Sequence, residues 1–143
     1  MKVSEVMTRD VRTVRPDDTA KDAASFMLSE DTGSMPVSDG DRLIGMITDR
    51  DIAVRGVAKG MGPDTPVSKL MTNEIVCARE DDEIEDVASR MSSAQVRRIP
   101  IVDASERLCG IVSLGDLSRE ADRQSADQAL QGVSAPGDQH RQG

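Results

Sequence analysis

Aromatic residues and histidine are nearly absent from this 143-residue sequence, and each shortage excludes a class of site. Phe26 is the only aromatic residue, so the chain lacks the set of rings on which nucleic-acid bases stack. The only histidine, His140, lies in a polar C-terminal stretch, which argues against a histidine-dependent catalytic triad and a histidine-based zinc site. We therefore expect no enzymatic function, and a core made of Val, Ile, Leu, Ala and the eight Met residues.

Cysteine and long apolar runs are also scarce. Cys77 and Cys109 lie far apart and form no CxxC motif, so we expect buried thiols in a reducing compartment rather than a disulfide or a redox pair. No run approaches 18 apolar residues, and the first five residues lack the apolar core of a secretion signal. These features predict a cytoplasmic protein that does not associate with a membrane.

The chain has fewer positively charged than negatively charged side chains. The 18 Lys and Arg residues face 26 Asp and Glu residues, which gives a formal net charge of −8 at pH 7. The field of such a protein repels polyphosphate backbones, so we expect no nucleic-acid partner. The length suits one compact domain or two closely packed repeats.

A tandem repeat organises the chain. When the sequence is compared with itself at an offset of 64 residues, 13 of the 34 positions in 3–36 and 67–100 are identical, against about two expected by chance. The motif Val-Ser-x-x-Met-Thr opens both copies. After a one-residue insertion, the segment 45–52 aligns with 110–117. The molecule is therefore an internal duplication.

Hydrophobic periodicity predicts the same elements in each repeat. Apolar residues at helical spacing predict helices at 20–28 and 84–91, the first of them capped by Thr19. A second helix is expected to begin at Thr48 in the first repeat and at Ser113 in the second. Short strands are predicted at 11–14, 35–37 and 43–47 in the first repeat and at 75–78, 99–102 and 108–112 in the second. Each repeat therefore has the order β-α-β-β-α.

Composition sets the boundaries between the parts of the chain. The stretch 56–66 contains three Gly and two Pro, which end a helix and join the repeats. From about Asp122 the chain has few large apolar side chains, so we expect no core there. We divide the chain into a first repeat at 1–62, a second repeat at 63–121 and a disordered C-terminal tail at 122–143.

Two repeats with these motifs resemble a pair of CBS domains, the Bateman module named after cystathionine beta-synthase. The resemblance covers 3–119 and rests on the two Val-Ser-x-x-Met-Thr openings, the strands around Pro36 and Pro100, and the Gly-x-x-Thr/Ser-x-x-Asp turns. The segment 47–52 is also similar to small stand-alone bacterial CBS pairs, including hypoxia-response proteins. The resemblance implies an α/β (α+β) module of two β-α-β-β-α repeats with pseudo-two-fold symmetry. It also implies sensing of adenine nucleotides without catalysis and without a required cofactor.

The turn before the last helix of each repeat carries side chains suited to a nucleoside. Asp51 and Asp116 each offer a carboxylate, which can accept both hydroxyls of a ribose. Thr48 and Ser113, three residues earlier, can bond a ribose or a phosphate. The same Thr/Ser-x-x-Asp spacing is also a capping box that stabilises any helix. The residues alone leave the structural role and the ligand role open.

An acidic chain needs a local cation to bind phosphate. Arg98 directly precedes Ile99-Pro100 and is similar to the basic residue that faces phosphate in CBS pairs; the alternative is a solvated arginine at a strand edge. The equivalent residue of the first repeat is Ser34, so the two sites are not equivalent. Arg50 either supplies charge to the first site or forms a pair on the helix surface.

The resemblance also assigns the base to main-chain groups of each repeat's first strand and to an apolar wall beside the proline. These positions are Thr13, Met35 and Pro36 in the first repeat and Cys77, Ile99 and Pro100 in the second. Met35 and Ile99 are equally well explained as core residues.

Two functions are compatible with these observations. The first is a regulatory module that holds adenosine-containing ligands in the cleft between the repeats and signals to an effector protein. AMP or ATP is the favoured ligand, with NAD and S-adenosylmethionine as further members of the class. The alternative is a structural module that dimerises or docks onto an enzyme and binds no nucleotide. In both cases we expect a homodimer, because some apolar helix surface must stay outside the core.

Overall fold

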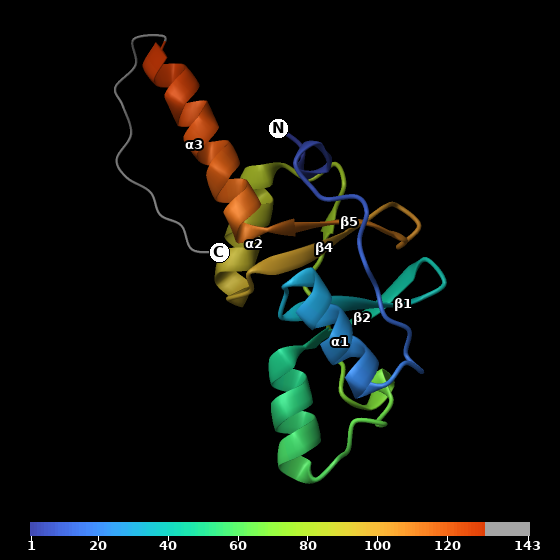
Figure 1. The fold of residues 1–143 in the computed structure, drawn as a ribbon. Helices are drawn as coiled ribbons and strands as arrows, with labels where there is room; N and C mark the ends of the chain where they lie inside the picture. Colours follow the sequence, from blue (N-terminus) through green and yellow to red (C-terminus); the bar gives the residue numbers. More distant parts are fainter. Residues whose placement is uncertain (131–143) are drawn as a thin grey trace. The chain divides into compact units, whose positions relative to one another are not determined.

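The structure, a computed structural model, describes residues 1–130. The chain forms two compact units, each with helices and strands of its own (Figure 1). The first-repeat unit comprises 10–75 and 102–108, and the second-repeat unit comprises 1–9, 76–101 and the chain from residue 109 onward. Residues 1–9 therefore belong to the unit of the second repeat, and residues 102–108 belong to the unit of the first. The limits of the units thus differ from the repeat boundaries that the sequence predicts.

The first-repeat unit pairs one helix with a two-stranded antiparallel sheet. Helix α1 (Ala20–Glu30) precedes β1 (Ser34–Asp39) and β2 (Arg42–Thr48). The π-helical segment η2 (Asp51–Gly56) follows β2, close to the predicted helix start. Two 3-10 turns complete the unit, η3 (Val57–Lys59) and η4 (Val67–Lys69). The core consists of Val14, Ala20, Ala23, Met27, Met35, Val37, Ile47, Val67 and Leu70.

Helix α1 forms as the periodicity predicts, although its buried face is narrower. The Thr19 hydroxyl accepts a hydrogen bond from the Asp22 N–H at 3.1 Å, and the Asp22 carboxylate accepts one from the Thr19 N–H at 3.0 Å. This reciprocal cap fixes the first turn. Met27 is buried, but Leu28, which belongs to the same predicted apolar stripe, is 85% exposed.

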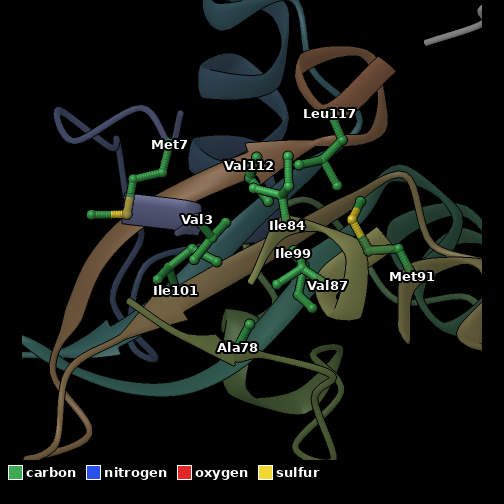
Figure 2. Close-up of a cluster of buried hydrophobic side chains, with 10 residues drawn as sticks. All are labelled: Val3, Met7, Ala78, Ile84, Val87, Met91, Ile99, Ile101, Val112 and Leu117. Carbon is green, nitrogen blue, oxygen red and sulfur yellow. The ribbon is translucent and has the colours of Figure 1, made fainter. Parts of the chain in front are cut away.

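The second-repeat unit repeats the design with a three-stranded sheet in the order β3-β4-β5. The strands are β3 (Ala78–Arg79), β4 (Arg98–Val102) and β5 (Leu108–Ser113), and the helices are α2 (Ile84–Ala94) and α3 (Leu114–Leu130). Figure 2 shows the core of this unit, in which Val3 and Met7 from the N-terminal segment lie with side chains of α2 and the sheet. The core consists of Val3, Met7, Ala78, Ile84, Val87, Met91, Ile99, Ile101, Val112 and Leu117.

The Val-Ser-x-x-Met-Thr motif of the N-terminus packs against β5. Thr8 and Ile111 exchange two backbone hydrogen bonds, at 2.8 and 2.9 Å. A Cβ atom on Gly110 would lie 2.8 Å from the Met7 Cγ and 3.0 Å from the Thr8 carbonyl oxygen. Only glycine lets the two backbones approach this closely.

The second copy of the motif makes the equivalent contact in the first-repeat unit. Thr72 and Met46 exchange backbone hydrogen bonds at 3.0 and 2.8 Å. A Cβ atom on Gly45 would lie 2.9 Å from the Thr72 carbonyl oxygen and 3.0 Å from the Met71 sulfur. In each unit, therefore, the methionine of a Val-Ser-x-x-Met-Thr motif packs against the glycine of a Gly-x-x-Thr/Ser turn.

The first strand of each repeat is shorter than predicted. In place of a strand at 11–14, only Val14 pairs: its N–H donates to the Pro36 carbonyl at 3.0 Å and its carbonyl accepts from the Ser38 N–H at 2.9 Å. Because proline has no N–H, Pro36 cannot donate the preceding bond of a parallel ladder, and the pairing stops there. The corresponding strand of the second repeat, β3, has two residues instead of four.

Helix α3 continues past Asp122, where the sequence analysis places the start of a disordered tail. Neither glycine nor proline occurs between Gly115 and the end of the helix at Leu130, so no residue of low helix propensity stops it. The rest of the predicted tail, 131–143, lies outside the described residues.

The two cysteines are unbridged, as expected, but less buried than expected. Cys77 and Cys109 are both half-buried and form no disulfide. The Cys109 thiol donates to the Ile101 carbonyl at 3.3 Å.

Candidate functional site

The Thr/Ser-x-x-Asp turns of the two repeats have the same geometry. In the first-repeat unit the Thr48 N–H donates to the Asp51 Oδ2 at 3.0 Å, and the Asp51 N–H donates to the Thr48 Oγ1 at 3.0 Å. In the second-repeat unit the Ser113 N–H donates to the Asp116 Oδ2 at 3.1 Å, and the Asp116 N–H donates to the Ser113 Oγ at 3.0 Å. The capping-box interpretation is therefore confirmed at both turns.

The cap uses only one oxygen of each carboxylate. The Asp51 Oδ1 lies 3.8 Å from the Arg55 Nε, and the Asp116 Oδ1 accepts a hydrogen bond from Arg119. The Asp51 side chain is 14% exposed and that of Asp116 is 24% exposed. Each Oδ1 is therefore held beside a guanidinium, on a carboxylate that is partly exposed to solvent.

The sequence analysis missed both of these arginines. Arg55 also donates to the carbonyl oxygens of Leu70 and Met71, at 3.4 and 3.2 Å, so it is fixed by the chain. Arg119 is exposed and contacts Asp116 from one helical turn away. An arginine three or four residues after an aspartate is a signal for such a pair, and it is present in both repeats.

The residues assigned to the apolar wall lie in the cores of their units. Met35 and Ile99 are 2% and 0% exposed, and Pro36 and Pro100 are also buried. The packing supports the core interpretation of Met35 and Ile99, whose side chains face other core residues.

The main-chain groups assigned to the base differ between the repeats. Thr13 is half-buried, and within residues 1–130 its carbonyl accepts no hydrogen bond. The Cys77 carbonyl accepts a hydrogen bond from the Arg90 Nη1 at 2.9 Å. The residue equivalent to Arg90 is Phe26, whose ring lies 4.7 Å from the Arg12 guanidinium carbon. Within the described residues, the carbonyl of the first repeat thus accepts no hydrogen bond, whereas the equivalent carbonyl of the second repeat accepts one.

The candidate phosphate-binding arginines are exposed. Arg98 begins β4, and its guanidinium makes no hydrogen bond or ion pair within the described part of the chain. Ser34 begins β1 at the equivalent place and pairs with Thr48 in the sheet. Arg50 is also exposed, and the ion pair with Asp51 comes from Arg55 instead. The structure therefore brings Thr48 and Asp51 together with Ser34, and places Arg98 at a strand end without a side-chain partner among residues 1–130.

Among residues 1–130, no helix is long and apolar enough to cross a membrane. In the same range, no group of three or more His, Cys, Asp and Glu side chains is placed to hold a metal ion.

The sequence matches known proteins over both repeats. A family model of the CBS domain matches residues 3–56 and 67–123. The chain is 43% identical over 133 residues to the CBS domain-containing protein YhcV of Bacillus subtilis, a match that covers 92% of this chain and 94% of that protein. It is 33% identical over 134 residues to Hypoxic response protein 1 of Mycobacterium tuberculosis, with 92% and 93% covered.

Solved structures match the fold over most of the chain. CBSX2 of Arabidopsis thaliana, in complex with AMP, has a TM-score of 0.76 and 26% identity, and the match covers 86% of this chain and 97% of that one. The CBS domain pair of protein MJ0100, in complex with 5′-methylthioadenosine and S-adenosyl-L-methionine, has a TM-score of 0.76 and 26% identity, with 87% and 98% covered. Both are CBS pairs with adenosine compounds bound.

Proposed function

The chain belongs to the CBS-domain family, and from this premise we propose that it is a regulatory module that binds an adenosine-containing ligand in each repeat and signals to an effector protein. The observation that carries the proposal is the duplicated turn around Asp51 and Asp116. In each turn one carboxylate oxygen caps the helix while the other lies near the surface. The capping role and the ligand role are therefore compatible.

The proposed binding mode assigns the ribose to the aspartates. A ribose presents two neighbouring hydroxyl donors, and each carboxylate oxygen has two lone pairs. The Oδ1 atoms of Asp51 and Asp116 can accept from these hydroxyls because the cap occupies only Oδ2. Bonds to an ionised acceptor are stronger than neutral ones, so these two residues are the main source of affinity for any ribose-bearing ligand.

Phosphate and base would be bound by neighbouring groups. Arg98 is exposed and unbonded within residues 1–130, so its guanidinium is available to a phosphate of AMP or ATP with little rearrangement. The Thr13 carbonyl is an acceptor for the amino group of an adenine in the first repeat. The AMP bound to CBSX2 and the S-adenosyl-L-methionine bound to the MJ0100 pair support this ligand class.

A thermal-shift panel with AMP, ATP, NAD and S-adenosylmethionine tests the proposal. A ligand that binds only the folded state stabilises it by about 2.7 kcal/mol at one hundred times its dissociation constant. The matched control is a double variant, Asp51→Asn with Asp116→Asn, which should lose the shift. If no member of the panel stabilises the parent, the chain is a structural module that dimerises or docks without a nucleotide.

A further inference from the structure

We infer that the first repeat takes an adenosine ligand whose 5′ group is uncharged or positively charged, such as a thioether or a sulfonium, and that Asp49 excludes phosphate there. This inference rests on the proposed function. It depends on a difference in charge between equivalent positions of the two repeats. The relevant pairs are Gly33 with Asp49 in the first repeat and Arg97 with Leu114 in the second.

A backbone hydrogen bond shows that these pairs occupy the same place. The Asp49 N–H donates to the Gly33 carbonyl at 2.9 Å, and the Leu114 N–H donates to the Arg97 carbonyl at 2.8 Å. In the first repeat the bond joins the residue after β2 to the residue before β1. In the second repeat it joins the residue after β5 to the residue before β4. Equal backbone geometry therefore carries different side chains in the two repeats.

In the first repeat a carboxylate fills the space above the glycine. A Cβ atom on Gly33 would lie 2.9 Å from the Asp49 Oδ2 and 3.3 Å from its Cγ. The other oxygen, Oδ1, accepts a hydrogen bond from the Arg50 N–H at 2.8 Å, which holds the carboxylate in this orientation. The negative charge therefore lies over Gly33, the residue before Ser34, whereas the equivalent residue of the second repeat, Arg97, carries a positive charge.

In the second repeat the charge has the opposite sign. Arg97 and Arg98 are both exposed, while Leu114 is half-buried and packs against the core. Over the five equivalent positions, the first repeat has two aspartates and one arginine, whereas the second has two arginines and one aspartate. These positions are 33, 34 and 49–51 in the first repeat, and 97, 98 and 114–116 in the second.

Arg50 and Arg55 do not restore a phosphate site in the first repeat. Arg55 is paired with Asp51 and bonded to the carbonyls of the two residues after η4, Leu70 and Met71. Because Arg55 is paired with Asp51, the exposed Arg50 offsets the charge of Asp49 and leaves no net positive charge for a phosphate. A phosphate dianion beside Ser34 would find no arginine on β1, and the charge of Asp49 over the neighbouring Gly33 would repel it.

The test is an NMR titration of the ¹⁵N-labelled full chain at physiological salt with adenosine, AMP and S-adenosylmethionine. The backbone amides of Asp51 and Asp116 report the two sites separately. At the first site we expect adenosine and S-adenosylmethionine to bind, and AMP to bind about fivefold more weakly than adenosine or worse. Asp49→Asn keeps an oxygen for the Arg50 N–H and should raise AMP affinity there about fivefold while changing adenosine affinity less than twofold.

The control is Asp64→Asn, which alters the net charge equally at an exposed connector residue. Three results overturn the inference: AMP binding more tightly than adenosine at the first site of the parent, an unchanged AMP-to-adenosine ratio in Asp49→Asn, or an equal change in Asp64→Asn. If AMP still shifts the Asp116 amide, the proposed function survives that failure. If none of the three compounds shifts either amide, both proposals are wrong.

Discussion

Substitutions of Asp116 separate its capping role from its proposed ligand role. Asp116→Ala removes the Oδ2 acceptor of the Ser113 N–H, bonded at 3.1 Å, and the ion pair with Arg119. Loss of a cap costs about 1 kcal/mol, within a range of roughly 0.5 to 2, and the ion pair of an exposed arginine adds at most about 1 kcal/mol. We expect the melting temperature to fall by about 2 to 6 °C.

Asp116→Asn provides the matched comparison. The asparagine oxygen still accepts from the Ser113 N–H, so most of the lost stability should return. The negative charge that the ribose hydroxyls would bond is gone in both variants, and a hydrogen bond to a charged group contributes about 1.5 to 3 kcal/mol. Calorimetry should therefore show that adenosine and AMP bind to the second site at least about tenfold more weakly in both variants, whereas the melting temperature recovers only in the asparagine variant. Parent-like affinity at the second site in Asp116→Asn would show that Asp116 is only a helix cap.

Three further predictions follow from exposure and packing. Arg98→Ala should leave stability unchanged, because the guanidinium has no partner within residues 1–130. In calorimetry it should weaken AMP binding by about 1.5 to 3 kcal/mol but hardly affect adenosine binding. Equal loss of affinity for both ligands would contradict the phosphate role. Gly110→Ala should cost about 1 to 3 kcal/mol in urea unfolding, because its Cβ would meet Met7, whereas Gly62→Ala, with open space around it, should be nearly neutral; equal costs would contradict the packing argument. Light scattering should give twice the 15.4 kDa chain mass, since Leu28 is 85% exposed; a monomer at tens of micromolar, with and without AMP, would exclude the homodimer.

Periodicity predicts the fold well because each element is specified locally. The apolar spacing and the Thr19 cap are enough to place α1, and strands β1 and β2 extend only one to two residues beyond the predicted limits. The first strand is overestimated at 11–14 because its length depends on a partner. Pro36 lacks the donor that would extend the ladder, a fact visible in the sequence only once the pairing is known.

The exchange of segments between the units lies beyond repeat analysis. An offset of 64 residues shows that the two Val-Ser-x-x-Met-Thr motifs are equivalent, but not which glycine each methionine contacts. The motif at the N-terminus packs on Gly110 and its second copy on Gly45. Long-range pairing of this kind depends on tertiary geometry, so the sequence predicts the units but not their limits.

The candidate aspartates are recognised because their spacing recurs, whereas their arginine partners escape the same search. The positions of Arg55 and Arg119 are not equivalent: Arg55 aligns with Glu120, and Arg119 aligns with Val54. Each repeat therefore supplies a guanidinium to its aspartate from a different helical position. Comparison of the two repeats does not identify these arginines, because the arginine–aspartate pair is present in both repeats but the arginine is not at equivalent positions.

The pattern of identity and change between the repeats bears directly on function. Asp18 and Asp82 are identical and make the same bond, accepting from the N–H three residues earlier at 2.8 and 2.9 Å. Identity is thus retained where a turn requires it. At Gly33 and Arg97 the backbone bond is also retained, at 2.9 and 2.8 Å, yet the charges around it differ: the first repeat has Asp49 there and the second has Arg97. A common structural role explains the constant backbone but not the different charges, whereas two sites for ligands of different charge explain both.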